Sequence, residues 1–167
     1  MPTTKKRINI VVDDDTYAIL KRVASMRSDS LAGTSLHLIA KGLEYREDLH
    51  FSRIADSRLS EKQKTILHEE AWQTVFKCRI KYLENVVNED IPKIPKNTRD
   101  QIRITIEDGL ERCLPAVFRF PGNEKPLLHT TRKARELRAK DWRIIYTIEP
   151  SDRALIVKIG HRKDAYE

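Results

Sequence analysis

The sequence has few of the residues that define several large classes of protein. Only two of its 167 residues are cysteines, Cys78 and Cys113, and no further ligand pair accompanies them, which excludes a zinc ribbon or a redox motif. No apolar run approaches the ~18 residues of a membrane span, and Asn9 and Asp13 interrupt the apolar stretch near the N-terminus. We therefore expect a cytoplasmic protein without metal or cofactor, whose cysteines are buried as small apolar side chains.

The positive charge is concentrated in the second half. The chain carries a formal net charge of +7, of which residues 76–167 supply +6, with 20 Lys and Arg against 14 Asp and Glu. Six of the twelve residues from Arg132 to Arg143 are cationic. A moderate excess of this kind usually marks a solvated surface, but its clustering favours a polyanionic partner. The 40% of apolar residues suffices for one domain or two small ones.

Residues 5–48 predict a strand followed by two short helices. From Lys5 to Val12 apolar and polar residues alternate, and the apolar positions then recur at helical spacing from the acidic residues 13–15 to Met26. Residues 28–33 should break this helix, and Thr34 or Ser35 can cap a second one. A single strand with an apolar face has no partner within this segment, so we expect it to pair with the same strand of a second copy.

This order, headed by RINIVVDDDTY, resembles the ribbon-helix-helix family of bacterial DNA-binding proteins. The resemblance implies a homodimer whose paired strands enter the major groove of operator DNA and whose second helix holds a phosphate through its first backbone amides. The implied DNA-binding residues are Lys5, Lys6, Arg7, Asn9, Val11, Thr34 and Ser35. The alternative is a dimerisation module whose strand only pairs.

Residues 47–72 read as two short helices without a core of their own. Their large apolar side chains indicate that the segment wraps another surface. The anchors are Leu49, Phe51, Ile54, Leu59, Ile66, Leu67 and Trp72. FSRIADSRL and HEEAW resemble the C-terminal arm of RelB-like ribbon-helix-helix antitoxins, which neutralises a toxin.

The remaining sequence predicts an α+β domain with an antiparallel sheet in the order β-α-α-β-β-β. It begins with a strand at residues 79–82, followed by a helix ending near Pro92 and Pro95 and a helix from Thr98. A hairpin follows, in which the strand of Ile144, Tyr146 and Ile148 faces a strand of Leu155, Val157 and Ile159 across a turn at residues 150–152.

Residues 78–167 resemble the RelE/ParE toxin superfamily. DIPKIPK, KPL, LRAKDWRIIY and GHRKDAY occur in the superfamily's order over some ninety residues. The whole chain therefore resembles an antitoxin fused to its toxin, and no Gly/Ser linker marks a junction. We expect a DNA-binding and dimerisation domain at residues 1–48, a neutralising arm and junction at 49–77, and a toxin domain at 78–167.

RelE-like toxins cut mRNA on the ribosome, and the resemblance implies catalytic roles for Arg138, Arg143, Arg162 and Tyr166. Guanidinium groups can stabilise the charge that develops when a ribose 2′-hydroxyl attacks a phosphate. Further RNA-binding candidates are Arg135, Lys140, Trp142, His161 and Lys163. His161 is a candidate proton acceptor, although a histidine at a strand end is more often structural.

Two departures from the family pattern leave the activity open. Glu136 stands where relatives tend to carry a basic residue, and Lys140 stands where they tend to carry glycine. Glu136 would weaken phosphate binding unless Arg138 or Arg143 engages it. One alternative is a transcription regulator with an inactive RelE-like domain, and a second is a ParE-like inhibitor of DNA gyrase.

Overall fold

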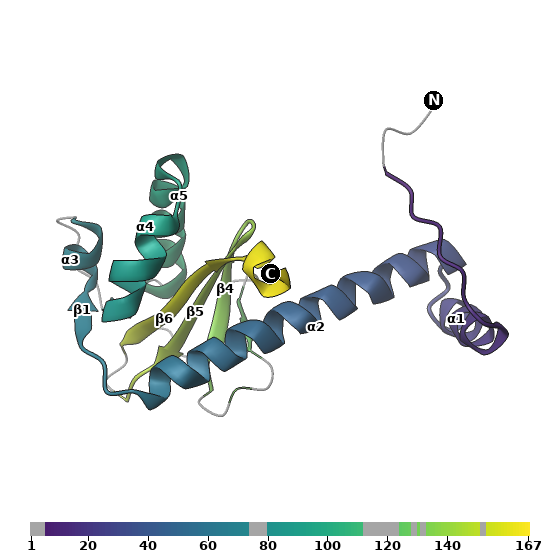
Figure 1. Ribbon diagram of the computed structural model, residues 1–167, viewed down its shortest axis with the longest axis horizontal. Helices are drawn as coiled ribbons and strands as arrows, with labels where there is room; N and C mark the ends of the chain where they lie inside the picture. Colours follow the sequence, from purple (N-terminus) through teal and green to yellow (C-terminus); the bar gives the residue numbers. More distant parts are fainter. Residues whose placement is uncertain (1–5, 74–79, 112–123, 128–129, 131–132, 151–152) are drawn as a thin grey trace. The chain divides into compact units, whose positions relative to one another are not determined.

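The computed structural model describes residues 6–73, 80–111, 124–127, 130, 133–150 and 153–167. The chain divides into two compact units, Met1–Glu44 and Tyr45–Glu167, and each is described here by itself. Helix α2 (Leu31–Ser60) begins in the first unit and ends in the second (Figure 1). Within the described ranges, no helix is both long enough and apolar enough to cross a membrane. Cys78 and Cys113 lie outside them, so their expected burial stays a prediction.

In the first unit, the second helix begins at a different residue from the one expected. Helix α1 (Asp14–Met26) has Asp13 as its N-cap, whose carboxylate accepts a hydrogen bond from the Thr16 backbone N–H at 2.7 Å. Helix α2 begins at Leu31, so the expected cap at Thr34 or Ser35 is wrong. The Ser30 hydroxyl instead accepts from the Gly33 N–H at 2.9 Å, which satisfies a free amide of the first turn.

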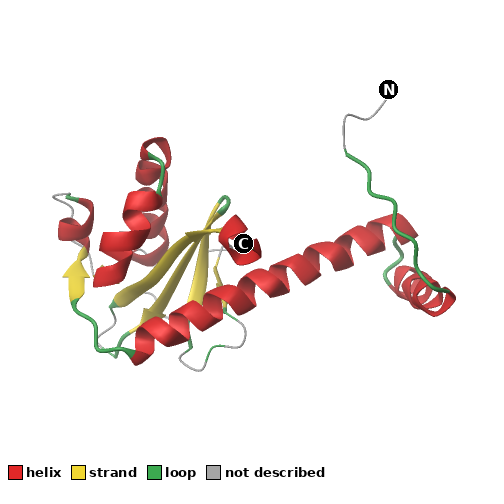
Figure 2. Ribbon diagram, viewed as in Figure 1, coloured by secondary structure: helices red, strands yellow, loops and turns green. Residues whose placement is uncertain are grey.

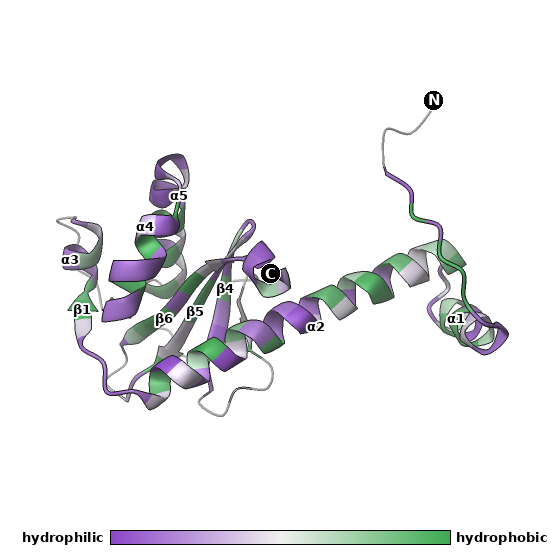
Figure 3. Cartoon of the chain, viewed as in Figure 1, coloured by the Kyte–Doolittle hydropathy of each residue, from purple (hydrophilic) through white to green (hydrophobic). Residues whose placement is uncertain are grey.

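The expected strand at residues 5–12 does not form within the single chain. Its described residues, 6–12, hold no regular secondary structure and are exposed (Figure 2). Val11 is 97% exposed and Ile8 is 81% exposed, and Figure 3 shows this apolar character on the segment that precedes α1. Other exposed apolar residues of this unit are Ile10, Val12, Tyr17, Ile19, Met26, Leu36, Leu38, Ile39 and Leu43.

The second unit is built on a six-stranded sheet in the order β1-β2-β6-β5-β4-β3. Its strands are β1 (Thr65–Leu67), β2 (Ile80–Leu83), β3 (Glu124–Pro126), β4 (Arg135–Ala139), β5 (Trp142–Ile148) and β6 (Ala154–His161). Among the described strands, only β2 and β6 pair in parallel. The helical elements after α2 are α3 (His68–Trp72), η1 (Val86–Asp90), α4 (Ile91–Lys93), α5 (Lys96–Ile106), η2 (Glu107–Glu111) and η3 (Arg162–Tyr166).

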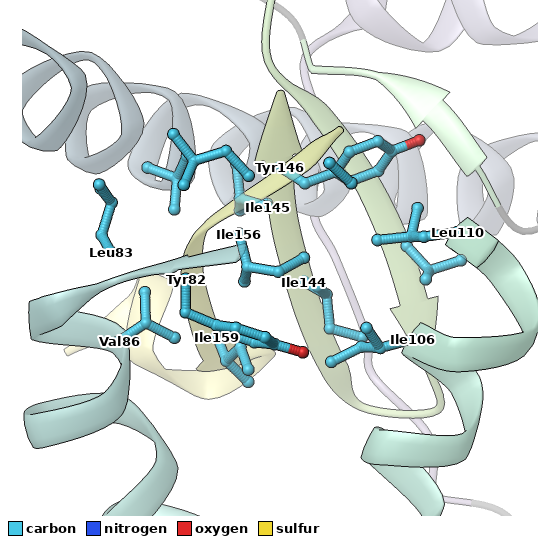
Figure 4. Packing of buried hydrophobic residues seen from close by; sticks show 14 of the residues in the cluster. Tyr82, Leu83, Val86, Ile106, Leu110, Ile144, Ile145, Tyr146, Ile156 and Ile159 are labelled. Carbon is cyan, nitrogen blue, oxygen red and sulfur yellow. The ribbon is translucent and has the colours of Figure 1, made fainter. Parts of the chain in front are cut away.

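The central hairpin forms as expected, but its register shifts once. Ile144 pairs with Ile159, whereas after a bulge at Val157 the side chain of Tyr146 faces Ile156. The expected face of Leu155, Val157 and Ile159 is therefore wrong, because the bulge moves Leu155 to the opposite side of the sheet. Figure 4 shows Ile144, Tyr146, Ile156 and Ile159 in the buried core with Ile106 and Leu110 from α5 and η2.

The second half of α2 covers the other face of this sheet. We call residues 45–60 of α2 the covering segment. The expectation of two short helices over residues 47–72 is correct only in part, because α3 is a short helix but α2 continues without a break to Ser60 and is followed by β1. Phe51 and Ala55 are fully buried, and the Phe51 ring lies directly over Gly160 of β6. Figure 1 shows the covering segment running beneath β4, β5 and β6.

Gly160→Ala should destabilise the second unit by about 1–3 kcal/mol, because a Cβ at this position would lie 2.7 Å from Phe51 Cε1. The control is Gly42→Ala in the same helix as Phe51, where a Cβ meets nothing within 4 Å and should stabilise the helix by roughly 0.5–1 kcal/mol. Chemical denaturation measures both changes. Equal effects of the two substitutions would contradict the close packing of Phe51 on Gly160.

Candidate functional site

The ends of β5 and β6 bring two arginines and a tyrosine together. Arg143 is the second residue of β5 and lies on the face covered by α2, opposite Gly160 of β6. Arg162 opens η3, whose first turn is closed by reciprocal bonds: His161 Nδ1 accepts from the Lys163 N–H, and the Asp164 carboxylate accepts from the His161 N–H. This turn folds the C-terminus back, so that Tyr166 reaches the same place as Arg143.

Glu47 of the covering segment occupies the point where these three side chains meet. Its Oε1 accepts hydrogen bonds from Arg162 Nη2 at 2.7 Å, Arg162 Nε at 3.1 Å and the Tyr166 hydroxyl at 2.8 Å. Its Oε2 accepts from Arg143 Nη2 at 2.7 Å. Glu47 is 1% exposed. A carboxylate that is held by two guanidinium groups and a phenol stands where a phosphate group would bind to the same donors.

The charges around Glu47 set its protonation state. Burial opposes ionisation, but the hydrogen bond from Tyr166 and the bond and charge of Arg143, together with the charge of Arg162, outweigh it and lower the pKa of Glu47 below its ordinary value of 4.5. Burial and then the bond to the Glu47 carboxylate raise the pKa of Tyr166 above 10.0. Tyr166 is therefore a protonated donor at neutral pH. The Arg46 guanidinium lies over its ring, 5.7 Å from the ring centroid.

Glu136 lies fully buried next to this cluster on the same face of the sheet. Arg138 Nε donates to Glu136 Oε1, and Arg143 Nε lies 3.7 Å from the same oxygen, too far for a hydrogen bond. Arg138 is thus bound to Glu136, whereas Arg143 is shared between Glu136 and Glu47. Glu136 was expected to weaken phosphate binding unless an arginine engages it, and Arg138 does engage it.

A second group of charges holds the other end of the covering segment. Arg58 Nη1 donates to Asp90 Oδ2 at 2.7 Å and to the Val157 carbonyl oxygen at 2.9 Å. The buried Asp90 also accepts from Lys158 Nζ at 2.6 Å and from the Ile159 N–H at 3.1 Å. Three helical turns separate Glu47 from Arg58, so both lie on the buried side of the helix with Phe51 and Ala55 between them.

The remaining residues expected in an RNA site do not join the Glu47 cluster. Trp142 and His161 lie on the opposite face of the sheet, where their rings meet edge to face at 5.3 Å. Arg135 lies on that face too and is partly buried, and Lys140 and Lys163 are exposed. Among the arm anchors Phe51 is fully buried, and Leu59 and Trp72 pack against the core. Leu49, Ile54 and Ile66 are partly buried, and Leu67 is exposed.

The residues expected to bind DNA lie in the first unit. Lys6, Arg7, Asn9 and Val11 are exposed, and Lys5 lies outside the described residues. Thr34 is fully buried and its N–H donates to the Ser30 carbonyl, while the Ser35 hydroxyl donates to the Leu31 carbonyl. The Thr34 amide is bonded within the helix, and the expected phosphate contact through the amides of Thr34 and Ser35 stays a prediction.

Sequence reasoning missed Glu47, Arg58 and Asp90. A signal was present, because Glu47, Phe51, Ala55 and Arg58 recur at intervals of four, four and three residues, which places them on one helix face. Charged residues at both ends of such an apolar stripe are unusual for a solvated helix face. No group of three His, Cys, Asp or Glu side chains suited to a metal ion occurs among the described residues.

A family comparison matches residues 82–166, just over half of the chain, to the ParE toxin of the type II toxin-antitoxin system parDE. The chain belongs to the ParE toxin family. The matched range begins within β2 and extends to the end of η3, so it includes Arg143, Arg162 and Tyr166 of the ParE domain, whereas Glu47 lies outside it. Searches of curated proteins and of solved structures gave no match.

The low pKa of Glu47 predicts how the stability of the second unit depends on pH. Because the folded-state pKa is below 4.5, the stabilisation from ionised Glu47 is complete above that pH and is lost as the pH falls through the folded-state pKa. The unfolding free energies of the natural chain and Glu47→Gln should therefore converge as the pH falls below 4.5. Denaturation at a series of pH values measures this difference, and a constant difference from pH 7 to pH 3 would contradict it.

Proposed function

We propose that this chain is a ParE-family toxin held inactive by a segment of its own, with Glu47 as the group that blocks its cationic cluster. The bonds from Arg143, Arg162 and Tyr166 to the Glu47 carboxylate carry this proposal. While Glu47 is bound, these donors are not available to a target. The burial of Phe51 and the pairing of Arg58 with Asp90 hold the covering segment in place at the same time.

The target favoured by the family match is DNA gyrase. The match runs from within β2 to the end of η3, and it is to ParE. In this proposal the uncovered face of the sheet is the surface that docks on gyrase, and no reaction is carried out by the toxin. A type II system supplies an antitoxin that covers its toxin, and the arm-like sequence of residues 49–72 is consistent with that role being built into this chain.

A second candidate is cleavage of mRNA on the ribosome, and the Glu47 cluster is the observation that favours it. Two guanidinium groups and a protonated phenol converge on one carboxylate, an arrangement that would also hold a scissile phosphate and stabilise its developing charge. In that reaction Arg143 and Arg162 would bind the phosphate, the attacking 2′-hydroxyl would lose its proton to water, and Tyr166 would donate a proton to the leaving 5′-oxygen as its bond to phosphorus breaks. Arg138 would act through Glu136, to which it is bonded.

Glu47→Arg in the full chain should release the covering segment, because it places a buried cation against Arg143 and Arg162. Expression should then arrest growth. At the same concentration, the purified variant should inhibit supercoiling by gyrase at least tenfold more strongly than the natural chain. Hydrogen exchange of residues 45–60 reports release directly. The matched control is Glu44→Arg, which changes a glutamate of the same helix that pairs with exposed Lys41 at 2.7 Å.

The outcomes separate the candidates. If gyrase is unaffected and new transcript ends appear on translating ribosomes, the gyrase target is overturned and RNA cleavage takes its place. Fast hydrogen exchange in residues 45–60 without growth arrest, gyrase inhibition or new transcript ends would overturn the toxin proposal and leave a transcription regulator with an inactive toxin domain.

We also propose that the first unit is a dimeric DNA-binding head. The observation that supports it is the exposed apolar surface of residues 6–12 and of both helices, which a second copy would remove from water. Pairing of residues 6–12 across a dimer would satisfy their backbone groups and present Arg7, Asn9 and Val11 to base edges. Operator binding of this kind would regulate transcription of the chain's own gene.

Binding sites selected from random duplex DNA by the full chain should show base preferences that Asn9→Ala relaxes, because its amide can bond adenine N6 and N7. Affinity should fall steeply with salt, since cationic residues near the strand neutralise phosphates. Lys21→Ala, which removes an exposed cation of α1, is the control and should leave the preferences unchanged. An Asn9→Ala profile identical to that of the natural chain would refute the ribbon assignment.

A further inference from the structure

An open pocket of about 180 Å³ lies between the start of α5 and the turn that joins β4 to β5. Its lining residues are Thr98, Gln101, Ile102, Ala139, Lys140, Asp141, Trp142 and His161. None of them belongs to α2, so the covering segment that blocks the Glu47 cluster does not close this pocket.

The alternation of the strands builds this pocket on the face opposite the Glu47 cluster. Trp142 pairs with His161 across β5 and β6, while the next pair along, Arg143 and Gly160, faces α2. The Trp142 and His161 rings meet at 86°, so the pocket has two aromatic surfaces that are perpendicular to each other. Neighbouring residue pairs of β5 and β6 thus place an aromatic site on one face of the sheet and a cationic site on the other.

The turn adds charge to the rim of the pocket. Lys140 has a φ of 56°, in the left-handed region that glycine adopts without cost and a side-chain-bearing residue adopts less readily. Lys140 thus stands at a position where glycine would be unstrained. Lys140 and Asp141 are both exposed, and they bring one cation and one carboxylate to the pocket.

The size of the pocket limits its occupant. Sites for drug-sized ligands measure ~300–1,000 Å³, and one water occupies ~30 Å³ in the liquid. A volume of about 180 Å³ is too small for the former and equivalent to several waters. One planar ring system fits such a space, and Ile102 and Ala139 give it an apolar floor.

We propose that this pocket binds a purine base, with adenine preferred. The base stacks on the Trp142 or His161 ring, as bases do on aromatic platforms in single-strand binding proteins. The Gln101 amide has both a donor and an acceptor, which complement adenine N7 and N6. Asp141 accepts from an exocyclic amine, and Lys140 pairs with the phosphate of the same nucleotide. The base comes from a free nucleotide or from a nucleic acid strand.

The test titrates the full chain with 5′-AMP and follows the fluorescence of Trp142. The chain has two tryptophans, so Trp72→Phe makes the signal specific, and indole NMR signals of the unchanged chain check that this background has not altered the pocket. We expect saturable quenching by AMP, weaker quenching by UMP and none by ribose 5-phosphate. Gln101→Ala should weaken AMP binding about tenfold, and Thr105→Ala, one turn further along α5, should not.

The outcomes decide the proposal and the source of the base. Tighter binding of an adenine trinucleotide than of AMP supports a nucleic acid strand as the source, and equal binding supports a free nucleotide. Quenching equal to that of ribose 5-phosphate, or insensitive to Gln101→Ala, would overturn the purine site. Because α2 does not line the pocket, these results are independent of whether Glu47→Arg activates a toxin.

Discussion

A buried carboxylate, Glu47, is the constraint on which the organisation of the second unit depends. An ionised group that is 1% exposed loses its hydration, and only close partners of opposite charge can replace it. Its four hydrogen bonds come from Arg143 on β5, Arg162 after β6 and Tyr166 at the end of η3. The contact thus requires the register of the hairpin, the turn at the C-terminus and the seating of α2 all at once. It also explains why the cationic Arg143 of the ParE domain can be buried beneath a helix.

The two faces of the sheet perform different tasks because strand residues alternate. Towards α2, β4, β5 and β6 present Glu136, Arg143 and Gly160, which are charged or lack a side chain, beside the apolar Ile145 and Leu155. Towards α5 the same strands present apolar residues such as Ile144 and Ile159, and at the strand end Trp142 and His161. Gly160 leaves room for the Phe51 ring, so the helix comes close enough for Glu47 to reach the arginines.

Periodicity and motif order predicted much of this structure, and long-range contacts limited the rest. The helix that follows the acidic residues 13–15, the central hairpin, the helices around Pro95 and membership of the toxin superfamily all followed from local patterns and motifs. The start of α2 was missed because Gly33 suggested a break, whereas Ser30 supplies the cap bond. The bulge at Val157 leaves no mark in the alternation of apolar residues. The role of Glu47 depends on residues about a hundred positions away, and no local rule indicates such a pairing.

The positions of the charges in the covering segment determine where the segment binds on the sheet more than how tightly it binds. Buried ion pairs recover little net free energy beyond their own desolvation, while breaking one by removing a partner is costly. Glu47 meets cations at one end of the segment, and Arg58 meets Asp90 at the other. Reversing the helix, or sliding it by one turn, would bury unpaired charges at both ends. Salt screens such buried pairs weakly, and Phe51 adds apolar contact between them. Release of the segment therefore requires that both ion pairs and the Phe51 contact are lost together.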